Sequence, residues 1–84
     1  MKPIRLSQHA RGYIQRRGFT MAEVEQAIRQ SRWNPAELNR LQCRKNFSFN
    51  SEWNGKHYAT KEVRPVFAEH PDEIVVITVY TYYF

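Results

Sequence analysis

Four side chains of this sequence are candidates for proton transfer or phosphate binding in one reaction: His9, Arg17, Lys61 and Tyr80. His9 carries an imidazole, the side chain that commonly serves as acid or base in proton transfer. Tyr80 or Lys61 could take the other proton-transfer role, and Arg17 could hold a phosphate through paired hydrogen bonds. These residue types match the metal-free cleavage of RNA, because attack of the 2′-hydroxyl on the adjacent phosphate needs a base, an acid and cations. We therefore predict these four residues as the catalytic candidates.

A second group of cations is predicted to contact the phosphate backbone of RNA. It consists of Arg44, Lys45, Lys56 and Arg64. The chain carries 13 Lys and Arg against 8 Asp and Glu, which gives a net charge of +5. In a small domain this balance favours a polyanionic partner, either RNA or an acidic protein. The alternative is that the charge serves only solubility.

Several of these candidates also have a purely structural interpretation. His9 could be a helix cap or a surface residue, and Arg17 could simply stabilise the negative end of a helix dipole. Tyr80 could pack within a sheet, and Lys61 could be solvated beside the bend that Pro65 predicts. Lys45 interrupts an apolar strand face, which indicates either a bulge or a lysine that reaches into a cleft.

The sequence lacks the patterns that hold metals or nucleotide cofactors. It has no Cys or His pairs at zinc spacing, no glycine-rich phosphate loop and no carboxylate cluster for two magnesium ions, so we predict no metal and no cofactor. Cys43 is the only cysteine, which rules out an internal disulfide and favours a reducing compartment. We see no signal peptide or membrane-spanning segment and predict a cytoplasmic protein that does not bind membranes.

The final stretch, Glu73–Phe84, is predicted to organise the fold. It is almost all β-branched or aromatic and contains no Gly or Pro, which is typical of a central strand. Strict alternation assigns one side to packing on helices, namely Val75, Ile77 and Val79. It assigns the other side to the ligand, namely Ile74, Val76, Thr78, Tyr80 and Tyr82.

The upstream segments predict two helices followed by strands. The first helix is expected from Gln8 to Arg17 and ends at Gly18. A capping box formed by Thr20 and Glu23 predicts a second helix that continues to about residue 30. Strands are expected over 41–50 and 56–68. This order predicts an α+β fold in which two N-terminal helices pack on one face of a three- or four-stranded antiparallel meander, as one domain over residues 1–84.

Short motifs along the chain resemble a bacterial family of unknown function that is similar to BrnT and, more distantly, to the RelE-like ribonuclease toxins. The resemblance covers nearly the whole chain, and the order and spacing of the motifs carry it. They are His9-Ala10, Arg17-Gly18-Phe19-Thr20, the stretch Glu23–Ile28, the residues Arg44, Lys45, Phe47, Lys56, Tyr58, Lys61 and Val63, and the ending Ile74–Tyr80. Tyr13 stands where the family pattern has a second basic residue.

The resemblance implies a RelE/BrnT-like domain that acts as the toxin of a bacterial toxin–antitoxin pair. The expected activity is a metal-independent endoribonuclease. The expected partners are RNA and a cognate antitoxin that is acidic or carries a DNA-binding part. The alternative is a non-catalytic module of the same fold that binds nucleic acid or an acidic protein. A homo-oligomer that uses the last strand as its interface is a third option.

Overall fold

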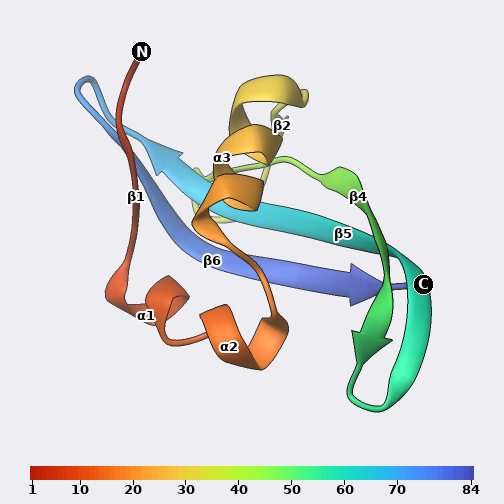
Figure 1. Ribbon diagram of the computed structural model, residues 1–84. Coiled ribbons are helices and arrows are strands. Elements are labelled where there is room, and N and C mark those ends of the chain that lie inside the picture. Colours follow the sequence, from red (N-terminus) through yellow and green to blue (C-terminus); the bar gives the residue numbers. More distant parts are fainter.

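The computed structural model describes residues 1–84 as three short helices and six strands. In chain order these are β1 (Ile4–Leu6), α1 (Gln8–Arg11), α2 (Ile14–Arg17), α3 (Met21–Gln30), β2 (Asn34–Pro35), β3 (Leu41–Gln42), β4 (Lys45–Trp53), β5 (Lys56–Glu69) and β6 (Ile74–Tyr83). All six strands form one sheet in the order β1-β6-β5-β3-β2, and β4 also pairs with β5 (Figure 1). The predicted central position of the last strand is confirmed, since β6 lies between β1 and β5.

The predicted fold, two helices on a three- or four-stranded antiparallel meander, is wrong. The sheet has six strands and is mixed, because β1 runs parallel to β6. β1 and β2, which read as a lead-in and a loop, supply additional pairing, and the strand predicted over 41–50 is divided at Cys43 and Arg44 into β3 and β4. β1 pairs with the edge of β6, while β2 and β3 form a small hairpin beside the C-terminal half of β5. Strands of two or three residues carry too little periodicity to stand out from a loop in sequence.

The first predicted helix is also divided in two. α1 ends at Arg11 with Gly12 as its C-cap, and Tyr13 adopts a non-helical conformation (φ −105°, ψ 0°) before α2 begins. Gly12 lacks the side chain that would favour the helical state, so a break there costs little. Two other signals are confirmed: Gly18 ends α2 in the left-handed conformation (φ 74°), and the capping box of Thr20 and Glu23 starts α3.

The hydrophobic core lies between the helices and one face of the sheet. Val24 and Ile28 of α3 pack with Val63 and Phe67 of β5 and with Val76 of β6, and all five are at most 2% exposed. Residues from α1 and α2 join the same cluster, so the three helices lie on this side of the sheet (Figure 1). We call this the helix-covered face. No helix packs on the opposite face, which we call the open face.

A bulge in β6 decides which of its side chains reach the open face. Phe67 of β5 pairs with Val76, but its neighbour Val66 pairs with Thr78, so Ile77 is the extra residue. Strict alternation is therefore wrong for the first half of β6: Ile74 and Val76 pack under the helices, whereas Thr78 and Tyr80 stay on the open face. Bulges re-aim side chains in this way and are common beside functional sites.

Candidate functional site

The open face presents a row of aromatic and basic side chains. Arg64 on β5 lies directly opposite Tyr80 on β6, and its guanidinium lies 4.9 Å from the ring centroid of Tyr82. Tyr80 and Tyr82 are 43% and 45% exposed. Large side chains at such exposure in the middle of a sheet leave their ring faces accessible to a ligand.

Arg17 reaches this row from the edge of β6. The pairing of β1 with β6 extends from Ile74 to Val76 and stops there, so the backbone groups that follow Val76 on that edge need other partners. The Arg17 Nη1 supplies one by donating to the carbonyl oxygen of Val79 (2.8 Å) and to the hydroxyl of Thr78 (3.2 Å). The same guanidinium lies 5.1 Å from the ring centroid of Tyr80. Arg17 therefore connects α2 to the sheet by hydrogen bonds and also places a positive charge beside the ring of Tyr80.

His9 joins the row through Tyr13. The His9 and Tyr13 ring centroids are 4.9 Å apart, and the Arg17 guanidinium lies 3.9 Å from the Tyr13 ring centroid. His9 is exposed on α1, and no hydrogen bond or ion pair holds its ring. Three of the four catalytic candidates, His9, Arg17 and Tyr80, therefore belong to one continuous series of contacts.

Lys61 is separated from the other three candidates. It lies on the helix-covered face and is 6% exposed. Its Nζ donates to the carbonyl oxygen of Gly18 (2.8 Å) and pairs with the carboxylate of Glu23 (2.8 Å), which is also the capping-box residue of α3. An ammonium group held by these partners and turned away from Tyr80 is part of the fold, and it does not reach the open face.

Arg44 and Arg64 line a small polar hollow of about 190 Å³ next to the row. Asn34, Gln42 and Cys43 complete its lining. The Arg64 Nη2 pairs with Glu62 (2.7 Å), but its Nε is buried and has no hydrogen-bond partner, the one such side-chain atom in the protein. Arg44 is exposed and unpaired. Two guanidinium groups with unused donors at one hollow suit an oxyanion such as phosphate.

The remaining predicted RNA-binding lysines lie at the margins of this surface. Lys45 begins β4, contacts the ring of Phe47, and borders a second hollow together with Arg44 and Glu62. The β4 bulge falls between Ser48 and Ser51 rather than at Lys45. Lys56 is exposed at the tip of the β4–β5 hairpin, over the ring of Tyr58. Neither lysine contacts the Tyr80 row.

Three residues of this surface were not among the candidates predicted from sequence. Tyr13 lies four residues from both His9 and Arg17, a spacing that brings side chains together on helical segments and that could have indicated it. Asn34 falls in what reads as a loop and Gln42 in the strand predicted over 41–50, and only the pairing of β2 with β3 brings both to Arg64.

Cys43 lines the small hollow but does not qualify as a nucleophile. It is 2% exposed, and burial raises the pKa of its thiol to about 11. The thiol is therefore protonated at neutral pH, whereas the reactive form is the thiolate. Burial likewise raises the pKa of Tyr83, which stacks on Trp53 and donates a hydrogen bond to the carbonyl oxygen of Arg17.

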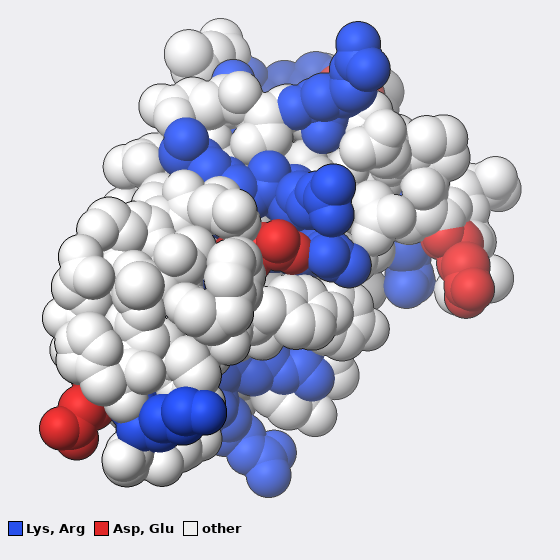
Figure 2. Space-filling view, turned by 90° about the vertical axis from the view of Figure 1, so that its right-hand side faces the viewer, with Lys and Arg blue, Asp and Glu red and all other residues white.

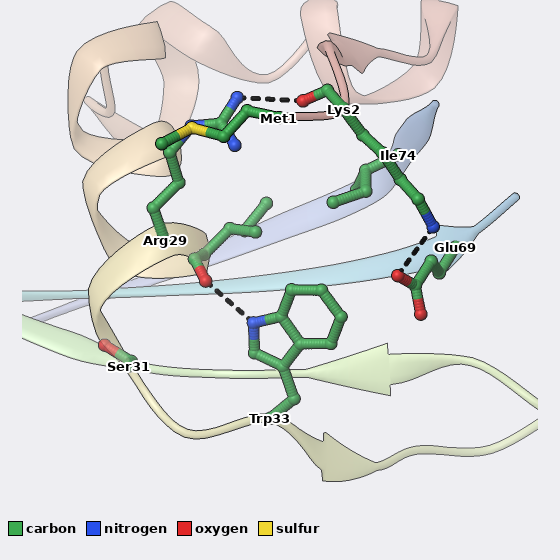
Figure 3. Close-up of a pocket in the computed structure, with 8 residues that line it drawn as sticks. Met1, Lys2, Arg29, Ser31, Trp33, Glu69 and Ile74 are labelled. Carbon is green, nitrogen blue, oxygen red and sulfur yellow. Dashed lines mark hydrogen bonds and ion pairs between the residues drawn. The ribbon is translucent and has the colours of Figure 1, made fainter. Parts of the chain in front are cut away.

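A separate hollow of about 490 Å³ lies where α3 ends beside β1 and contains none of the predicted residues (Figure 3). Ile28, Trp33 and Ile74 form its apolar lining. Its cations are already engaged, since Lys2 pairs with Glu69 (2.8 Å) and Arg29 donates to the carbonyl oxygen of Lys2 (2.9 Å). This hollow therefore offers little unpaired positive charge to a phosphate.

Positive charge dominates one side of the molecule. On the side that carries the C-terminus and the β4–β5 hairpin, Lys and Arg atoms form a discontinuous band with only small groups of acidic atoms (Figure 2).

No group of three or more His, Cys, Asp or Glu side chains is arranged to hold a metal ion. None of the helices has both the length and the apolar character needed to cross a bilayer.

Comparison of the chain with protein-family models, with curated proteins and with solved structures finds no match. The resemblance to BrnT and RelE-like toxins therefore stays a prediction from motifs.

Proposed function

We propose that this protein is a metal-independent endoribonuclease whose substrate lies across the open face. One observation carries the proposal: the exposed Tyr80 lies between Arg17 of α2 and its cross-strand neighbour Arg64 on β5, whose guanidinium lies against Tyr82. The Arg17 guanidinium lies 5.1 Å from the ring centroid of Tyr80. Cations beside a proton-transfer group stabilise the charge that develops on a phosphate as it is attacked.

In the proposed reaction the 2′-oxygen forms a bond to phosphorus and the bond from phosphorus to the 5′-oxygen breaks. The products are a 2′,3′-cyclic phosphate and a free 5′-hydroxyl. His9 and Tyr80 carry the two proton transfers, from the 2′-hydroxyl and to the departing 5′-oxygen. Arg17 and Arg64 hold the phosphoryl oxygens, and Arg17 has two nitrogens to spare because only its Nη1 is bonded within the protein. Arg44 binds a neighbouring phosphate.

We further propose that the protein is the toxin of a toxin–antitoxin pair and acts in the cytoplasm. Its net charge of +5 and the basic band support a cognate antitoxin with an acidic surface. A buried free thiol at Cys43 is compatible with a reducing compartment.

The test is cleavage of single-stranded RNA by purified protein in EDTA. Tyr80→Phe removes the hydroxyl and keeps the ring, and His9→Ala removes the imidazole. Each is expected to slow cleavage by roughly 100-fold or more, the usual contribution of a proton-transfer group. The Tm should change little because both side chains are exposed.

Matched controls come from the same chain. His57→Ala removes another exposed imidazole, and Tyr58→Phe removes a hydroxyl that makes no hydrogen bond in the structure, so both should leave cleavage unchanged. In bacteria, induced wild-type protein should arrest growth and degrade RNA, and Tyr80→Phe should not. Equal inactivity of wild type and variants on RNA, together with harmless expression, would remove the proposal.

The second candidate function is a nucleic-acid-binding module without catalysis. It is favoured by the burial of Lys61, which leaves fewer reacting groups on the open face than the sequence suggested. In that case RNA affinity should fall steeply with salt while no product appears. An acidic protein bound to the same face would be displaced by RNA in a competition assay.

A further inference from the structure

The turn between β2 and β3 overhangs the open face beside Tyr80. Together with β5 and β6 it encloses a hollow of about 570 Å³. The lining residues are Pro35, Ala36, Glu37, Leu38, Arg40, Gln42, Val66, Thr78 and Tyr80. This hollow adjoins the proposed reaction site, because Tyr80 belongs to both.

Leu38 is the unusual residue of this turn. Its side chain is 78% exposed, and its backbone is in the left-handed region (φ 58°), as is that of Asn39 (φ 59°). Asn tolerates this conformation, whereas a leucine is strained in it. An apolar side chain that is both exposed and strained contributes little to folding, and such strain is found where a residue serves a ligand.

The lining of the hollow selects the kind of ligand. Pro35 and Val66 give it apolar walls, while Glu37 and Arg40 supply one charge of each sign. A bare phosphate would be repelled by the carboxylate of Glu37. A purely apolar ligand would leave both charges unused. A nucleobase satisfies both parts, since it has flat apolar faces and an edge with donors and acceptors.

We infer that this hollow is a nucleobase slot, in which an unpaired base of the RNA packs between Leu38 and Tyr80. The inference rests on the proposed function, because the base belongs to a nucleotide beside the phosphate that is cleaved. Bases in a duplex are stacked and paired, so the slot restricts the substrate to single-stranded or looped RNA. The identity of the base would be read at its edge by Glu37 and Arg40.

The test separates the leucine side chain from the shape of the turn. Leu38→Gly removes the side chain and relieves the backbone strain, so its Tm should be equal to or above that of the wild type. Asn39→Gly relieves strain at the next residue and leaves Leu38 in place. The probe is a fluorescent single-stranded RNA 8-mer with 2′-O-methyl riboses, which cannot be cleaved, and binding is followed by fluorescence anisotropy.

We expect Leu38→Gly to weaken binding roughly tenfold, a loss typical of removing one stacking contact to a base, and Asn39→Gly to bind as the wild type does. An abasic 8-mer should bind all three proteins equally and more weakly. Equal binding of the normal 8-mer by wild type and Leu38→Gly would overturn the slot and leave the proposed function standing. Equal loss in both glycine variants would overturn it too, because turn conformation would then be responsible. Failure of the wild type to bind any RNA would remove both proposals.

Discussion

Lys61 and Arg64 lie three residues apart on β5, yet they have opposite surroundings. Lys61 points under the helices and is 6% exposed. Its ammonium group pairs with the Glu23 carboxylate and donates to the carbonyl oxygen of Gly18. Arg64 points to the open face, where its side chain is 32% exposed, contacts Tyr82 and keeps an Nε without a partner. The first cation is buried and held by a carboxylate and a carbonyl oxygen of the protein, whereas the second is partly exposed and has a free donor.

This difference separates cations that stabilise the fold from cations that can bind a ligand. Removing the partner of a buried charge destabilises a protein strongly, whereas an exposed charge contributes little to stability and much to the attraction of a polyanion. The two faces of one strand therefore predict different consequences for similar substitutions.

The largest effect is expected for Lys61→Met. It leaves the Glu23 carboxylate without its cation on the helix-covered face, and the free energy of unfolding should fall by about 3 to 5 kcal/mol in urea denaturation. RNA affinity of the folded protein should not change. If Lys61→Met kept its stability but lost RNA cleavage, Lys61 would belong with Arg64 and the comparison would fail. The double variant Lys61→Met/Glu23→Gln should lose less than the sum of the single changes.

Gly18→Ala tests the same buried region without touching a charge. Gly18 has φ 74°, and an added Cβ would lie 2.4 Å from the Tyr83 hydroxyl and 2.6 Å from the Trp53 ring. We expect a loss of roughly 2 to 4 kcal/mol from backbone strain and overpacking. Gly55→Ala is the matched control, since φ is 82° but no atom lies within 4 Å, and it should cost about 1 kcal/mol. Similar losses at both glycines would show that Trp53 and Tyr83 are loosely held.

Cys43 marks the boundary between the two regions, because it is buried in the core and yet lines the hollow of Arg44 and Arg64. Burial raises the pKa of its thiol from 9.0 to about 11, so the folded state holds this proton more tightly than the unfolded state. Stability from this group is complete below pH 9 and is lost as the pH rises toward 11, by roughly 2 to 3 kcal/mol. The difference in unfolding free energy between wild type and Cys43→Ala should shrink over that range. A constant difference would place the thiol in contact with water.

The smallest effect is expected for Arg64→Lys. It keeps a charge for Glu62 but loses the planar fork and the contact with Tyr82. RNA affinity should fall about 5- to 10-fold, stability should change by less than about 1 kcal/mol, and the salt dependence of binding should be retained. Arg44→Met, which removes an unpaired charge, should instead reduce the salt slope by about 1. Wild-type affinity in Arg64→Lys would indicate that Arg64 acts only as a point charge.

Much of the local structure was predictable because its signals are local. The capping box at Thr20 and Glu23 and the left-handed Gly18 were found in the expected places, since neighbouring residues determine them. The central position of β6 was predictable from its composition. The division of the first helix at Gly12, the strand β1 and the hairpin of β2 and β3 were not, because each depends on pairing or packing with distant parts of the chain.

By itself the sequence determined which functional groups are present, namely an imidazole, phenols and an excess of arginines. It also determined that the C-terminal segment forms a strand on which some of these groups lie. The tertiary structure decided which of these groups meet. A one-residue bulge at Ile77 turns Ile74 and Val76 under the helices while Tyr80 stays opposite Arg64 on the open face. The pairing of β2 with β3 brings Leu38 over the same face, and the pleat of β5 sends Lys61 beneath the helices. The physical reason is that side chains alternate between the faces of a strand, so a shift of one residue moves a group to the other side of the sheet, and long-range pairing sets that shift.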